Sequence, residues 1–165
     1  MADAGDRGTV LIRAAGAADR EFIRALAARL VTFPLPRGRS KHVALVATRN
    51  ALDHALQATA PDAAFFISTT LRGARSGFLR LEYQRDFFSG APVCHVAEIV
   101  VAKRYEGRGV GRALLGHAQD MAHKHHCALL TLNVFPGNAR ARRLYAQLGF
   151  HDELIRMLKP LRHTL

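Results

Sequence analysis

The chain has 165 residues, the length of one ordinary domain, and 49% of them are hydrophobic, so it can bury a core. No apolar stretch reaches the roughly 20 residues that a membrane-spanning helix needs, and the first residues lack the pattern of a secretory signal. Cys94 and Cys127 form no CxxC pair, so we expect reduced thiols in a cytoplasmic protein with a single domain over residues 1–165. The formal net charge of +11 favours partners that carry phosphate.

The first half of the chain predicts an alternation of strands and helices. An apolar, β-branched run predicts a strand over 9–15, and apolar residues at helical spacing predict a helix over 18–31. A loop rich in proline follows, and Ser40 is the expected N-cap of a second helix that runs to residue 57. Strands are expected over 63–69 and 77–84, on either side of a turn.

The second half predicts a strand, a glycine loop, and then helices and strands in turn. Strands are expected over 93–101, 127–135 and 153–161, and helices over 111–126 and 138–148. Gly149 is the residue expected just after the end of the last helix. This order indicates an α/β fold of the α+β kind, a central mixed sheet flanked by about four helices.

Three glycines, Gly107, Gly109 and Gly111, lie between an expected strand and the start of a helix. The free amides of a helix N-terminus, together with the helix dipole, make an anion site, and glycines let a pyrophosphate approach the backbone. A P-loop requires Lys and then Ser or Thr after its last glycine, whereas Arg112 and Ala113 follow Gly111. A dinucleotide fingerprint requires a third glycine at position 112, which is arginine.

The spacing that remains resembles the GCN5-related N-acetyltransferase (GNAT) superfamily, whose signature loop is Arg or Gln, two residues, Gly, one residue, and Gly or Ala. Gly109 and Gly111 fit the two small positions, while Glu106 stands where Arg or Gln is usual, a departure that Arg108 and Arg112 can offset. A second motif of the family follows, and this chain fills each of its fixed positions: Leu132, Val134, Asn138, Ala141, Leu144, Tyr145, Leu148, Gly149 and Phe150. The resemblance is specific over 93–161 and rests on element order alone over 9–92.

The resemblance implies acetyl-CoA as co-substrate and transfer of its acetyl group to a primary amine of a small molecule, peptide or protein. It implies that the CoA phosphates meet the loop residues Gly107, Arg108, Gly109, Val110, Gly111 and Arg112. The pantetheine arm is expected to pair with the backbone of Ile99, Val100 and Val101, in a slot where two strands part and where Pro136 and Gly137 stop the pairing. Asn138 is expected to contact this arm, and it also suits the N-cap of its helix.

Three residues are the catalytic candidates. The resemblance gives Tyr145 the role of protonating the departing thiolate, beside its alternative as an ordinary core aromatic. Glu98 is the first candidate base, with a structural ion pair as its alternative, and His95 is the rival base. Regular alternation puts His95 and Glu98 on opposite faces, unless a bulge intervenes, and puts Cys94 on the face of Glu98.

Other functions remain open alternatives. His123, His125 and His126 belong to a solvated helix end, and no ligand spacing indicates a metal site. A transferase for a longer acyl-CoA, a CoA-binding module without transfer and a nucleic-acid-binding module are the alternatives. Nucleic acid is not the expected partner, because the arginines are dispersed and aromatic residues make up only 7%.

The apolar run over 153–161 also predicts assembly. Many relatives carry a longer final hairpin than this run provides, so the last strand is expected to be an exposed edge. We therefore expect a homodimer in which a second copy covers that edge.

Overall fold

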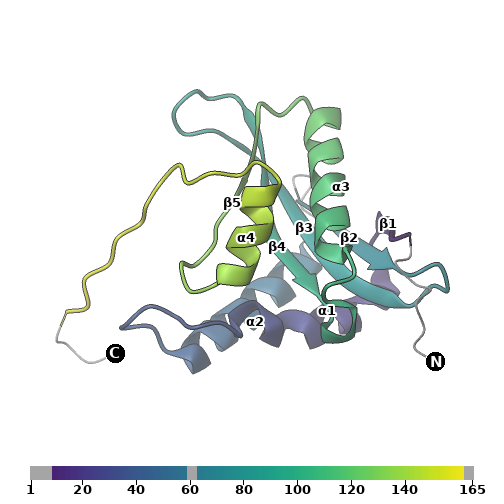
Figure 1. Ribbon diagram of the computed structural model, residues 1–165, viewed down its shortest axis with the longest axis horizontal. Helices are drawn as coiled ribbons and strands as arrows, with labels where there is room; N and C mark the ends of the chain where they lie inside the picture. The colour runs from purple at the N-terminus through teal and green to yellow at the C-terminus, as the bar shows by residue number, and fades with distance from the viewer. Residues whose placement is uncertain (1–8, 59–62, 162–165) are drawn as a thin grey trace.

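A computed structural model describes residues 9–58 and 63–161, and the chain forms one five-stranded sheet with helices on both faces (Figure 1). The strands are β1 (Leu11–Ala14), β2 (Ala63–Thr69), β3 (Arg75–Arg85), β4 (Pro92–Val101) and β5 (Leu129–Leu132). The longer helices are α1 (Arg20–Leu26), α2 (Lys41–Gln57), α3 (Val110–Lys124) and α4 (Ala139–Gln147), and short 3-10 helices are η1 (Ala17–Asp19), η2 (Ala27–Val31) and η3 (Lys103–Tyr105).

The sheet is mixed and its strands follow chain order. The pairs β1–β2, β2–β3 and β3–β4 are antiparallel, whereas β4 and β5 are parallel and are connected through α3. The expectation of a mixed sheet with about four helices is confirmed.

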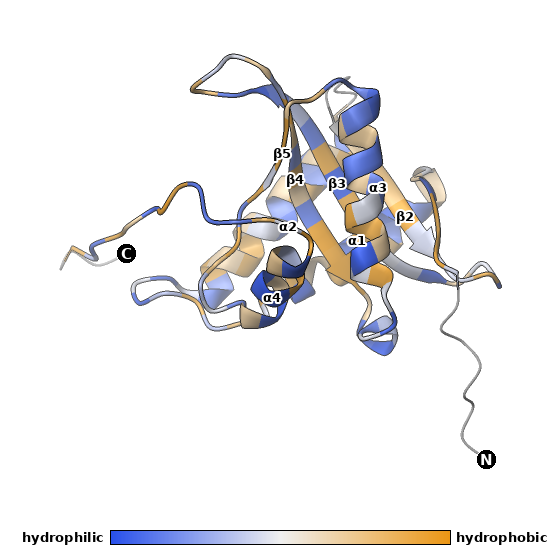
Figure 2. Cartoon of the chain, turned by 45° about the horizontal axis from the view of Figure 1, so that its top comes forward, coloured by the Kyte–Doolittle hydropathy of each residue, from blue (hydrophilic) through white to orange (hydrophobic). Residues whose placement is uncertain are grey.

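Each face of the sheet has its own core. Leu79, Leu81 and Val96 pack under α3 and α4, while Phe78 and Val100 pack under α1 and α2. Figure 2 shows apolar segments of β3 and β4 beside α3, interrupted by polar residues. Because residues alternate between the faces of a strand, this division tells which side each polar side chain of β3 and β4 occupies.

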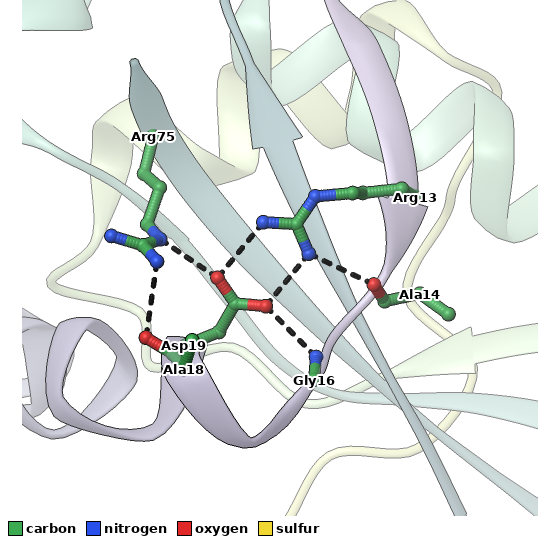
Figure 3. Close-up of polar contacts among 6 residues, drawn as sticks. All are labelled: Arg13, Ala14, Gly16, Ala18, Asp19 and Arg75. Atoms are coloured by element: carbon green, nitrogen blue, oxygen red, sulfur yellow. Dashed lines mark hydrogen bonds and ion pairs between the residues drawn. The ribbon is translucent and has the colours of Figure 1, made fainter. Parts of the chain in front are cut away.

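A buried carboxylate joins the first turn of the N-terminal helical region to the sheet (Figure 3). Asp19 accepts hydrogen bonds from Arg13 of β1 at 2.7 and 2.9 Å and from Arg75 of β3 at 2.7 Å. The Gly16 amide donates to the same carboxylate at 2.8 Å. Four donors therefore compensate a carboxylate that is almost fully removed from water.

The strand expected over 153–161 is absent, and that prediction is wrong. Residues 151–161 run as an extended tail away from the upper end of α4 (Figure 1). Apolar residues occur in adjacent pairs there, Leu154 with Ile155 and Met157 with Leu158, so no single apolar face forms. Pro160 also lacks an N–H to donate.

Candidate active site

The glycine loop turns the chain from β4 into α3. Gly109 is the N-cap of α3 and has φ of +82°, a left-handed conformation that an L side chain adopts only with strain. Gly111 lies in the first turn of α3, and a Cβ there would stand 3.1 Å from Leu144 Cδ2 of α4. The loop therefore presents the free amides of a helix N-terminus beside a closely packed neighbouring helix, an arrangement that suits an anion.

Charged side chains surround this loop. Arg108 lies over the ring of Tyr105, with Cζ 5.9 Å from its centroid, and Arg112 donates to Gln147 of α4 at 3.0 Å. Glu106, the residue that departs from the family pattern, accepts hydrogen bonds from Arg29 of η2 and Arg140 of α4. The carboxylate is thus neutralised by two arginines, a cluster that the sequence did not reveal.

Strands β4 and β5 part beside this loop. Their pairing ends at Val96 and Leu132, although β4 continues for five residues to Val101. The expectation that pairing stops at Pro136 and Gly137 is wrong, because β5 ends four residues earlier at Leu132. A bulge in β4 at Ala97 directly follows the last pair and redirects the strand.

Only part of residues 99–101, the segment expected to pair with the pantetheine arm, has its backbone groups at the open edge of β4. Ala102 N donates to Ser76 O of the β3 side at 2.8 Å, and in an antiparallel pair such residues alternate with residues that face away. The backbone groups of Val101 and Ile99 therefore face the side that β5 has left. Val100 faces β3, and its side chain is buried under α1 and α2.

The bulge brings His95 and Glu98 to one face of the sheet. Glu98 pairs with Arg80 and His95 with Glu82, and these two residues of β3 share the face covered by α1 and α2. Cys94 pairs with Tyr83 and lies in the core under α3. The expectation that Cys94 shares the face of Glu98 is therefore wrong, since the extra residue at Ala97 shifts the alternation by one.

The two candidate bases have different surroundings. Glu98 is 13% exposed, and Arg80 donates to both of its oxygens, the second at 3.0 Å. His95 Nδ1 lies 2.9 Å from Thr131 Oγ1, and its Nε2 lies 3.5 Å from Asn133 Nδ2. Burial lowers the pKa of His95, so the neutral imidazole dominates at neutral pH. When Nδ1 donates to Thr131, Nε2 is left as a proton acceptor.

Tyr145, a residue of α4, lies on the other face, in the core between α4 and the sheet. Its ring packs on Phe150 with centroids 5.8 Å apart, and burial raises the pKa of its hydroxyl. Asn138 caps α4, and its Oδ1 accepts from the Ala141 amide at 3.3 Å. Tyr145 and His95 thus lie on opposite faces of the sheet, and His95 is one residue before the position at which β4 and β5 part.

Comparisons with known proteins find sequence relatives and structures of similar fold. N-alpha-acetyltransferase 40 of Saccharomyces cerevisiae is 42% identical over 36% of this chain and 24% of its own length. The ribosomal protein bS18-alanine N-acetyltransferase of Escherichia coli is 45% identical over 35% of this chain and 39% of its own length. The chain thus spans well under half the length of these curated relatives.

Among solved structures, the aminoglycoside N-acetyltransferase AAC(6')-Iy in complex with CoA superposes with a TM-score of 0.66 at 21% identity. The superposition covers 99% of this chain and 100% of that one, and it supports the fold. The model of the acetyltransferase (GNAT) family matches residues 30–150. The chain therefore belongs to the acetyltransferase (GNAT) family, whose co-substrate is acetyl-CoA.

Proposed function

We propose that this chain transfers the acetyl group of acetyl-CoA to a primary amine. The observation that carries the proposal is the parting of β4 and β5 directly beside a glycine loop at a helix N-terminus. In the reaction a C–N bond forms and the C–S bond of the thioester breaks. The amine gives up one proton and the thiolate takes up one, so the site needs an acceptor and a donor.

The loop and the open strand edge suit the co-substrate. In this proposal the amides of residues 107–112 hold the pyrophosphate, with Arg108 and Arg112 close by, and the backbone of Ile99 and Val101 pairs with the pantetheine arm. Acetyl-CoA supplies an activated acetyl thioester. Asn138 stands at the start of α4, where it fixes the helix end beside the slot.

The proton-transfer roles follow from the surroundings of each residue. Tyr145, whose raised pKa keeps its hydroxyl protonated at neutral pH, donates to the thiolate. His95 accepts the proton of the amine, directly or through water, because burial keeps its imidazole neutral. Glu98 is committed to Arg80, and in this proposal the pair positions the acceptor face instead of acting as the base.

The N-terminal amine of a protein is the acceptor class that we favour. The two relatives named above carry names of enzymes that acetylate such amines. Glu82, which shares Arg80 with Glu98 and lies on the same face as His95, has a partly exposed carboxylate beside which an ammonium group can lie. None of the helices in residues 9–58 and 63–161 is both long and apolar enough to cross a bilayer. We place the activity in the cytoplasm, where the two thiols stay reduced.

We also propose a homodimer, supported by the tail. Ile155 is 78% and Met157 89% exposed, and Figure 2 shows apolar residues along the tail. The tail touches the body near its start, where Arg142 donates to Asp152 at 2.9 Å, and near its far end, where a Cβ on Gly38 would lie 3.0 Å from Pro160 Cγ. Light scattering across a concentration series should give twice the mass of one chain, 18.1 kDa. A constant mass of one chain would refute the dimer.

The test of the activity is thiol release from acetyl-CoA in the presence of a panel of amines and short peptides with free N-termini. Tyr145→Phe should reduce turnover about 10²-fold with CoA affinity unchanged, because only the hydroxyl is lost. His95→Gln should reduce turnover by a similar factor, and Glu98→Gln by less. Gly109→Val should abolish CoA binding in a folded protein. If no amine yields thiol and no CoA binds in calorimetry, the proposed function is wrong.

A further inference from the structure

One arginine connects the open edge of β4 to the glycine loop. Arg29 of η2 donates through Nε to Val101 O at 2.9 Å and through Nη2 to Glu106. These partners lie 72 and 77 residues further along the chain. The other carboxylate oxygen of Glu106, Oε2, accepts a hydrogen bond from Arg140, so each oxygen of this carboxylate binds one arginine.

The carbonyl that Arg29 occupies is one of those that a bound pantetheine arm needs. Val101 O faces away from β3, on the side where β5 has separated, and it is therefore free of sheet pairing. An extended amide chain that adds to a strand edge uses such outward-facing carbonyls. A carbonyl oxygen can accept two hydrogen bonds, but a guanidinium on Val101 O and an amide N–H of the pantetheine arm both approach from the side that β5 has left, so they compete for the same space.

We propose that Arg29 is a gate on the co-substrate slot, an inference that rests on the proposed function. In the free protein the guanidinium covers Val101 O, and Glu106 holds it there. Entry of the pantetheine arm moves Arg29 off the carbonyl, while the Glu106 carboxylate keeps it beside the loop. The departure from the family pattern at position 106 thereby acquires a role, since a carboxylate is the group that retains an arginine.

The gate lowers affinity for CoA but not for a ligand without the arm. Hydrogen bonds from charged donors are stronger than those from neutral amides, so displacing Arg29 is expected to weaken CoA binding by about tenfold. Adenosine 3′,5′-bisphosphate carries nucleotide phosphates and no pantetheine, so it leaves Arg29 in place. The loss of one positive charge near the phosphates weakens the binding of both ligands alike. The ratio of the two affinities therefore reports only the effect of Arg29 on Val101 O.

The experiment is calorimetry of CoA and of adenosine 3′,5′-bisphosphate with the unaltered protein, Arg29→Met and Arg140→Met. Arg29→Met should raise the ratio of CoA to bisphosphate affinity by about tenfold. Arg140→Met, the matched control, removes the other arginine on Glu106 without touching Val101 O and should leave the ratio unchanged. An unchanged ratio in Arg29→Met, or an equal rise in both variants, overturns the gate.

A second readout needs no substitution. In a spectrum of arginine Nε–H groups of the unaltered protein, CoA should shift the Arg29 signal and speed its exchange with water, and the bisphosphate should leave it as it was. An Arg29 signal that CoA does not move overturns the gate. A protein that binds no CoA at all refutes the proposed function and the gate together, whereas CoA binding with a constant ratio refutes the gate alone.

Discussion

Asp19 and Glu106 are both carboxylates held by two arginines, but they lie in different regions of the molecule. Asp19 is 1% exposed, and its arginines come from β1 and β3 of one sheet, with the Gly16 amide as a further donor (Figure 3). The side chain of Glu106 is 29% exposed, and its arginines come from η2 and α4, two separate helical segments.

The difference shows that two features decide the role of such a cluster: how deeply the carboxylate is buried, and whether its arginines come from one sheet or from separate helices. A carboxylate buried among strands cannot release a partner without leaving charge uncompensated in the core. A partly exposed carboxylate can exchange a partner for water at small cost. The Asp19 cluster is therefore structural, and the Glu106 cluster has the properties of an adjustable contact.

The largest expected effect is that of Asp19→Asn on stability. Removal of one partner of a buried ion pair costs about 3 kcal/mol, which for a chain of this size lowers the midpoint of thermal unfolding by roughly 6–12 °C. Urea unfolding of Asp19→Asn and of Glu106→Gln gives the comparison directly. We expect Glu106→Gln to lower the free energy of unfolding by less than about 1 kcal/mol. Equal losses in the two variants would contradict the division into structural and adjustable clusters.

A second expected effect is a dependence of stability on pH that belongs to Asp19. Hydrogen bonds from Arg13, with those from Gly16 and Arg75, hold the pKa of Asp19 well below its ordinary value of 3.8. Because the folded pKa is lowered, the carboxylate stabilises the fold above that ordinary value, and this contribution falls as the pH drops below about 4. In urea unfolding between pH 3 and 7, the free energy of unfolding should fall less steeply with decreasing pH for Asp19→Asn than for the parent protein. Parallel curves would show that other groups control acid unfolding.

A third effect is smaller and concerns pairwise coupling. A double-mutant cycle with Arg75→Met and Asp19→Asn should give a coupling free energy above 1 kcal/mol, since the carboxylate is buried. The cycle with Arg29→Met and Glu106→Gln should give about 0.5 kcal/mol, since both side chains are about a quarter exposed. Both cycles use urea unfolding at pH 7. A larger coupling at Glu106 would make Arg29 a structural residue and weaken its role as a gate.

Local features of the site could be predicted from the sequence. The glycine loop and the Asn138 cap depend on residues within one turn of each other, so their spacing is visible in the chain. The mixed sheet and its helices follow from periodicity in the same way. The last strand could not be predicted correctly, because a strand requires a partner and an apolar run does not show whether one exists.

Contacts between remote segments were beyond sequence reasoning. The pair of Arg29 with Glu106 depends on how η2 packs against the end of β4, which no spacing encodes. The pair of Arg80 with Glu98 left a signal, since both charges interrupt apolar strands predicted one after the other in the chain. Matching the two strands in antiparallel register would have found that partner.

The bulge at Ala97 makes the length of β4 matter more than the identity of the residue there. Deleting this alanine would leave a regular ladder in which Glu98 still pairs with Arg80 and Val96 with Leu81, so residues 92–96 would keep their faces. The deletion would instead remove the local bend of β4 directly after its last pair with β5, where the two strands part. Substitutions at Ala97 should therefore be tolerated far better than a one-residue deletion, and a variant library with both kinds of change would separate chain length from side-chain chemistry at this position.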